Sequence, residues 1–162
     1  MYVALYLAAI IAANLTVAAF GPGVTIVNAF LFIGLDLTAR DGLHETWRGR
    51  GMTWKMASLI AAGSLLSWFL NRGAGSIALA SFVAFAAAGL VDALTYHLLG
   101  RRVRFVRVNG SNVVSAAVDS LVFPTLAFGA LLPWIVLGQF AAKVVGGYLW
   151  SLILIRPKPA HA

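Results

Sequence analysis

Apolar runs long enough to cross a lipid bilayer take up most of this chain, and they limit its fold more than any other feature. A spanning helix needs about 20 mainly apolar residues. Six such runs, separated by glycine, proline or charged residues, occupy residues 1–20, 24–40, 54–70, 76–99, 111–129 and 132–155. Only helices or closed barrels satisfy the backbone in lipid, and the runs lack the strict alternation of barrel strands. We therefore predict one domain over residues 1–162, an all-α integral membrane bundle of six transmembrane helices.

The composition excludes a water-soluble fold. Only 10% of the residues are charged and 61% are hydrophobic, whereas soluble domains carry about 25% charged residues. The first run holds no Lys or Arg, so we expect a retained helix and not a cleaved signal. The net charge of +7 would suggest nucleic-acid binding in a soluble protein. Here the basic residues lie between the apolar runs, so we expect the lipid bilayer, and no nucleic acid, as the partner.

The basic residues alternate between the expected connections. The 40–55 connection, the 101–107 connection and the tail together hold ten Lys or Arg, and the other three connections hold one, Arg72. Cytoplasmic loops carry an excess of Lys and Arg. This pattern predicts an even number of spans in the cytoplasmic (inner) membrane, with both termini in the cytoplasm.

Polar side chains recur at helical spacing within the apolar runs. A charge at the centre of a spanning helix costs about 2.5–3.5 kcal/mol on insertion scales, so charges there are seldom without a use. Four runs each carry one polar stripe with a period of three to four residues, and such stripes should face a shared interior. We expect a solute site lined by Asn28, Asp36, Arg40, Ser81, Asp92, Asn112, Asp119, Phe123, Gln139 and Lys143.

A purely structural role is the alternative for these groups. Asp119 or Asp92 could pair with Lys143 as a buried ion pair that fixes the register of the helices. Arg40 could serve Asp36, one turn away on the same helix. The set as a whole still favours a solute site, because one lysine cannot neutralise three carboxylates. Small residues are expected to let helices pack closely, namely Gly63, Gly89, Gly146 and Gly147.

Enzyme signatures are weak. His44 and Glu45 lack a second histidine at metal-ligand spacing, no serine lies in a nucleophile motif, and there is no phosphate-binding glycine loop. The chain has no cysteine, which excludes disulfides and thiolate chemistry. We expect no catalytic residue, no metal and no cofactor, and a membrane enzyme is the last of the alternatives.

Several segments together resemble a known family. They are Leu35-Asp36-Leu37-Thr38-Ala39-Arg40, then Ala80-Ser81-Phe82-Val83-Ala84-Phe85 with Asp92, then Gly110-Ser111-Asn112 leading to Val118-Asp119-Ser120-Leu121-Val122-Phe123, and Lys143. In this order and spacing, from about residue 10 to residue 150, the chain resembles the VUT family of queuosine-precursor transporters. That family is similar in turn to the substrate-binding components of energy-coupling-factor vitamin transporters. One departure is Arg40, where many members carry Glu.

The resemblance implies a 7-deazaguanine cargo, either 7-cyano-7-deazaguanine or its aminomethyl relative. A guanine-like edge presents N–H donors that a carboxylate accepts in a bidentate pair, and Asp119 or Asp92 would play that part. Asn112 and Gln139 would read the carbonyl and ring nitrogens.

Two further roles follow from the same resemblance. Phe123 or Trp134 would stack on the flat ring, and Lys143 would hold an acid in its charged form or reach the carbonyl oxygen. Two other readings stay open: a vitamin-binding component that needs separate ATPase subunits, and a non-transporting membrane protein such as a pore-former. The cargo among related compounds, the driving force and the oligomeric state, a homo-oligomer included, are not determined by the sequence.

Overall fold

The chain folds entirely into helices over the part that the structure describes. This structure, a computed structural model, describes residues 1–47, 51–100 and 104–154. The elements in chain order are α1 (Tyr2–Phe20), η1 (Pro22–Val24), α2 (Thr25–Asn28), η2 (Ala29–Ile33), α3 (Gly34–Thr46), α4 (Met52–Leu70), η3 (Arg72–Ala74), α5 (Gly75–Leu98), α6 (Arg104–Phe128) and α7 (Pro133–Leu154). η1 and η3 are 3₁₀ turns, and η2 is a π-helical segment that joins α2 to α3. No strand occurs within these ranges, which confirms the all-α prediction.

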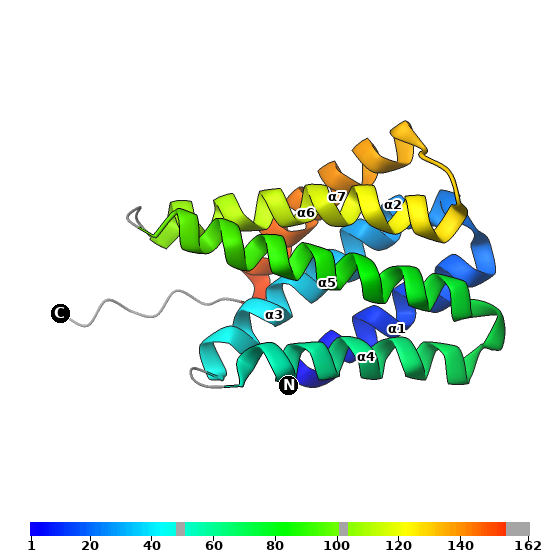
Figure 1. The fold of residues 1–162 in the computed structure, drawn as a ribbon, viewed down its shortest axis with the longest axis horizontal. Helices are drawn as coiled ribbons and strands as arrows, with labels where there is room; N and C mark the ends of the chain where they lie inside the picture. The colour runs from blue at the N-terminus through cyan, green and yellow to red at the C-terminus, as the bar shows by residue number, and fades with distance from the viewer. Residues whose placement is uncertain (48–50, 101–103, 155–162) are drawn as a thin grey trace.

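The long helices run back and forth along the longest axis of the molecule (Figure 1). The end of α3 and the start of α4 lie at the left of the view, as do the end of α5 and the start of α6. The turns that join α1 to α2, α4 to α5 and α6 to α7 lie at the right. We call these the left and right ends of the bundle below. α5 and α6 pack side by side along their length.

Three segments are long and apolar enough to cross a membrane: Tyr2–Phe20, Arg72–Thr95 and Gly110–Phe128. Pro22–Asp36 and Trp54–Leu70 are apolar but shorter. Length and composition therefore support a membrane protein. A full set of six spans and the orientation of the termini stay predictions.

Two helices extend beyond the apolar runs from which they were predicted. α3 continues to Thr46, and α6 begins at Arg104, so the connections near 40–55 and 101–107 are shorter than the sequence suggested. An apolar run marks the part of a helix that suits lipid. The helix itself can continue past the apolar run, because polar side chains are also compatible with helical backbone hydrogen bonds. As a result Arg40, His44 and Glu45 lie within α3 and not in a connection.

Glycine permits one very close helix contact in the core of the bundle. A Cβ atom placed on Gly34 of α3 would lie 2.7 Å from the backbone carbon of Gly146 in α7. One on Gly146 would collide with the carbonyl oxygen of Phe30 in η2. Gly63 similarly faces Ile10, 2.9 Å from its would-be Cβ. The expectation of close packing was wrong for Gly89, whose would-be Cβ meets nothing within 4 Å.

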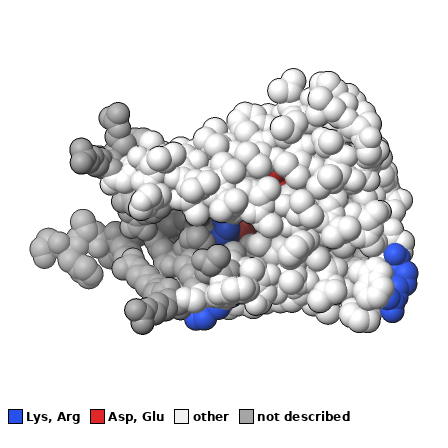
Figure 2. Space-filling model, in the orientation of Figure 1, with Lys and Arg blue, Asp and Glu red and all other residues white. Residues whose placement is uncertain are grey.

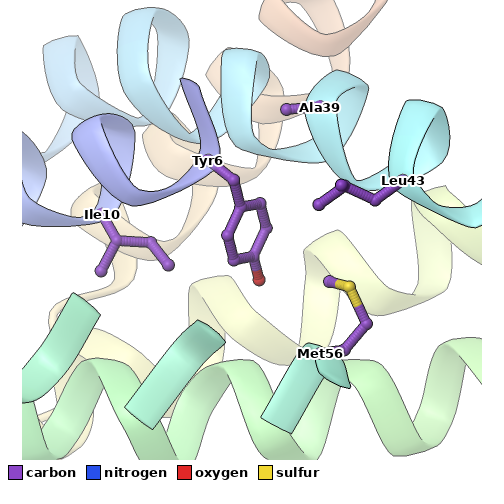
Figure 3. Close-up of a cluster of buried hydrophobic side chains, with 5 residues drawn as sticks. All are labelled: Tyr6, Ile10, Ala39, Leu43 and Met56. Carbon is purple, nitrogen blue, oxygen red and sulfur yellow. The ribbon is translucent and has the colours of Figure 1, made fainter. Parts of the chain in front are cut away.

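The left half of the bundle holds an apolar cluster (Figure 3). Its buried members come from three helices: Tyr6 and Ile10 of α1, Ala39 and Leu43 of α3, and Met56 of α4. The Tyr6 ring points from α1 into the space between α3 and α4. This cluster joins the two N-terminal helical hairpins, because α1 and α3 belong to the first and α4 to the second.

The outer surface is dominated by large apolar side chains, among them Leu79, Leu90, Leu94 and Leu137. Figure 2 shows one face of the molecule as almost uniformly uncharged, with basic groups mainly at its edges. Polar groups, by contrast, are concentrated inside. A molecule of this kind suits a lipid surround, in which apolar side chains face outward at no cost.

We predict that the Gly34–Gly146 contact limits stability. Gly146→Ala should destabilise the protein by about 1–3 kcal/mol, the usual cost of overpacking a close contact. Gly89→Ala, a matched control in an open position, should be neutral or slightly stabilising because alanine favours helix. Thermal unfolding of the purified protein in detergent measures both, and equal melting temperatures for the two variants would contradict this reading of the contact.

Candidate functional site

A buried lysine forms the centre of the polar interior. Lys143 of α7 is 2% exposed, and its Nζ donates to Asp119 Oδ2 at 2.5 Å, to Ser120 Oγ at 3.0 Å and to Gln139 Oε1 at 3.2 Å. An ammonium group has three N–H donors and no acceptor. All three donors are therefore directed at protein acceptors from α6 and from one turn earlier in α7. The expected pairing of Lys143 with an acid is confirmed for Asp119.

The same geometry limits what Lys143 does. Since its three donors are already used, Lys143 positions the groups around it and does not itself present an N–H to a solute in this conformation. Of the Asp119 carboxylate, the described hydrogen bonds use only Oδ2. The positioning of Asp119 and Gln139 by one lysine is the main organising feature of the site.

A pocket lies against this network. In this conformation its cavity measures about 20 Å³, roughly the space of one water molecule, so a base-sized cargo would enter only after the lining side chains move apart. α1, α2, η2, α5, α6 and α7 contribute to its lining, which consists of Ala13, Asn14, Val17, Thr25, Asn28, Ile33, Ser81, Phe85, Asp119, Phe123, Gln139 and Lys143. These positions lie in the halves of their helices that are nearer the right end of the bundle.

Hydrogen bonds to the protein fix how the pocket amides are turned. Asn28 Nδ2 donates to Thr16 Oγ1 at 2.7 Å and to Ala13 O at 3.2 Å, which uses both of its N–H groups. Its carbonyl oxygen is thus the group left for the pocket. Asn14 Nδ2 donates to Ser67 Oγ at 3.1 Å. Gln139 is turned the opposite way: Oε1 accepts from Lys143, and the buried Nε2 has no hydrogen-bond partner among the described residues.

A second polar cluster lies between α3, α5 and α6. Arg40 Nη2 is 3.9 Å from Asp92 Oδ1 and donates to Asn112 Oδ1 at 3.2 Å. Asn112 precedes Asp119 by about two turns of α6, roughly 10 Å along the axis, and Asp92 follows the pocket residue Ser81 by three turns of α5. The cluster is therefore displaced from the pocket toward the left end of the bundle.

The ten residues expected at one site thus separate into groups. The structure brings Asn28, Ser81, Asp119, Phe123, Gln139 and Lys143 together around the pocket. Arg40, Asp92 and Asn112 form the second cluster, and Asp36 is buried on α3 one turn before Arg40. The single solute site expected from the sequence stays a prediction; six of its ten residues line this pocket and the other four do not, because positions two or three turns apart on one face of a helix share a direction but not a depth.

Six residues of the lining were not among the ten expected from the sequence: Asn14, Thr25 and Phe85, and the apolar Ala13, Val17 and Ile33. Two of them carried a signal in the sequence: Asn14 is a polar residue and Phe85 an aromatic residue within an apolar run. Thr25 follows the Gly-Pro-Gly turn and had no such signal. Trp134, a candidate for stacking, is 59% exposed and does not line the pocket.

We predict strong coupling between Asp119 and Lys143. Lys143→Met should destabilise the protein by about 3–5 kcal/mol, because it leaves a buried carboxylate without its partner. Adding Asp119→Leu should recover most of that loss, since an apolar pair replaces an ion pair at little net cost. A double-mutant cycle of unfolding free energies in detergent measures the coupling, and additive effects of the two substitutions would contradict the ion pair as drawn.

Comparisons with known proteins identify the family of the chain. Residues 12–156 match the family described as "Putative vitamin uptake transporter". Searches of curated proteins and of solved structures found no match. The family match covers well over half of the chain, and the apolar helices and buried polar pocket are what a solute carrier in a membrane requires. The chain belongs to the VUT family of vitamin uptake transporters.

Proposed function

We propose that this membrane transporter imports a 7-deazaguanine across the cytoplasmic membrane, and that the pocket beside Lys143 holds the cargo. One observation carries the proposal: the polar lining of the pocket offers several acceptors and few donors. A guanine-like base has the opposite inventory, with ring N–H and exocyclic NH₂ donors and one carbonyl acceptor.

The acceptors come from three helices. Asp119 contributes a carboxylate from α6, which forms an ion pair with Lys143. Asn28 contributes a carbonyl oxygen from α2, because both of its N–H groups are used elsewhere. Asn14 of α1 has already committed one N–H to Ser67. Hydrogen bonds from neutral N–H donors to a carboxylate are among the stronger ones in proteins, so Asp119 is the proposed anchor.

Flat surfaces complete the pocket. Phe85 of α5 and Phe123 of α6 line it and are both only partly buried. Stacking of a base on an aromatic side chain contributes about 1–3 kcal/mol to binding in proteins that bind single-stranded nucleic acids. A bicyclic base held against one of these rings would direct its polar edge toward Asp119 and Gln139.

Charge favours an uncharged member of the class. Asp119 and Lys143 neutralise each other, and binding a charge next to a balanced buried pair would leave that charge uncompensated. The 7-cyano compound is uncharged, whereas the 7-aminomethyl compound carries an ammonium group. The pocket therefore suits 7-cyano-7-deazaguanine better.

The proposed orientation places both termini and the left end of the bundle in the cytoplasm. It is supported by the excess of basic residues in the connections at that end and in the tail. The pocket would then lie in the half of the bundle nearer the outside, and the Arg40–Asp92–Asn112 cluster would lie between the pocket and the cytoplasm.

We predict that 7-cyano-7-deazaguanine stabilises the purified protein in detergent against heat. At 100 times its dissociation constant a ligand adds about 2.7 kcal/mol, which a thermal-shift measurement resolves. Asp119→Asn should abolish the shift, because it removes the anchoring charge. Asp92→Asn is the matched control, with the same substitution outside the pocket, and should retain it. No stabilisation by any deazapurine, or equal loss in both variants, would overturn the proposal.

Single introduced cysteines test the proposed orientation, in which the left end of the bundle faces the cytoplasm. The chain has no cysteine of its own to interfere. A membrane-impermeant maleimide added to intact cells should label Ser76→Cys, which is exposed at the right end near the start of α5. It should label Trp54→Cys, exposed at the start of α4, only after the membrane is permeabilised. The reverse pattern would invert the proposed orientation.

A further inference from the structure

Gln139 Nε2 is the one fully buried side-chain atom of the pocket that has no hydrogen-bond partner within the described part of the chain. The side chain is 2% exposed, and its Nε2 is buried without a hydrogen-bond partner there. A buried unsatisfied donor costs about 1–3 kcal/mol. Such a group is rarely left in a folded interior unless something else meets it.

Lys143 fixes the direction of this donor. A glutamine amide can be turned by 180°, which exchanges its oxygen and nitrogen. Here the oxygen lies 3.2 Å from Lys143 Nζ, and turning the amide would bring two donor groups together. Lys143 cannot accept a hydrogen bond. The donor end of Gln139 is therefore locked away from Lys143, on a side chain that lines the pocket.

The neighbouring pocket amide of Asn28 has the opposite polarity, and Asn14 has one N–H group already used. Asn28 has used both N–H groups on Thr16 and Ala13, and Asn14 donates to Ser67. Asp119 only accepts while it is ionised. A solute that placed an N–H or NH₂ group against Gln139 would meet donor with donor, whereas a carbonyl oxygen would satisfy it.

We propose that Gln139 determines which class of base the transporter accepts: it selects a cargo that carries a carbonyl oxygen at this position and rejects the analogue that carries an amino group. Lys143 acts as the positioning residue that holds Gln139 in the selective orientation. This inference rests on the proposed function, because it concerns the same pocket and the same class of cargo.

The rejection should be substantial. A site built to hydrogen-bond a substrate group discriminates strongly against an analogue that lacks it, because the buried partner is then left unpaired. The cost of one unsatisfied buried donor corresponds to roughly ten- to hundredfold in affinity. The wild-type protein should therefore bind 7-cyano-7-deazaguanine at least tenfold more tightly than its diamino analogue, in which an amino group replaces the carbonyl and the adjacent ring nitrogen carries no hydrogen; the part of this preference that depends on Gln139 is the part that its variants lose.

The test measures dissociation constants of both compounds by calorimetric titration of the full-length protein in detergent. Gln139→Leu removes the donor and should reduce the preference for the carbonyl compound by about tenfold or more. Gln139→Glu keeps an acceptor for Lys143 but replaces the NH₂ group by oxygen, and should reduce the preference by a larger factor than Gln139→Leu does. Ser64→Ala, which removes a buried hydroxyl outside the pocket, should leave the preference unchanged.

The outcomes separate the two proposals. If the wild type binds 7-cyano-7-deazaguanine but both Gln139 variants keep its preference, the role of Gln139 is overturned and the proposed cargo stands. If the wild type binds neither compound, the proposed cargo is overturned, and the role of Gln139 with it. If Gln139→Leu does not yield folded protein, the preference measured with Gln139→Glu decides alone.

Discussion

The burial of the Lys143 ammonium group constrains the C-terminal half of the structure. A charge removed from water must be paired and its donors satisfied, or it destabilises the fold by several kcal/mol. Lys143 meets this requirement with a carboxylate and a hydroxyl from α6 and an amide from its own helix. The two α6 acceptors fix how α6 and α7 lie against each other, and Lys143 holds Asp119 and Gln139 in one orientation each. This arrangement determines where the pocket presents hydrogen-bond acceptors and where it presents a donor.

The close contact of glycine backbones allows the network to form where it does. Gly34 and Gly146 let α3 approach α7 so closely that a Cβ atom on either glycine would collide with the opposite backbone. Gly146 follows Lys143 by less than one turn, so the contact and the ion pair restrain the same part of α7. The π-helical segment η2 lies directly at this contact. Such segments occur often at functional sites, and here the segment leads from Asn28 to Ile33, which both line the pocket.

The polar interior is layered along the bundle. The pocket residues of α5 precede Asp92 and those of α6 follow Asn112, so the cluster that Arg40 forms with Asp92 and Asn112 lies nearer the left end than the pocket does. Arg40 thereby connects α3 to α5 and α6. α5 and α6 line the pocket themselves, and α3 continues from η2, which also lines it. Below these layers the apolar cluster around Tyr6 joins α1, α3 and α4 (Figure 3).

The sequence by itself determined the helical class, the location of each apolar run to within a few residues, and the polar residues that turn inward. These properties are local: they follow from hydropathy, helical period, and the glycine and proline residues at helix ends, as at Gly21 and Pro133. Only the tertiary structure decided which inward-facing residues meet. Residues on one stripe, such as Asn112 and Asp119, share a direction but differ in depth, and depth depends on how neighbouring helices are staggered. The direction of the Gln139 amide was decided in the same way, because it depends on Lys143 one turn further along α7 and on the two α6 side chains that hold that lysine.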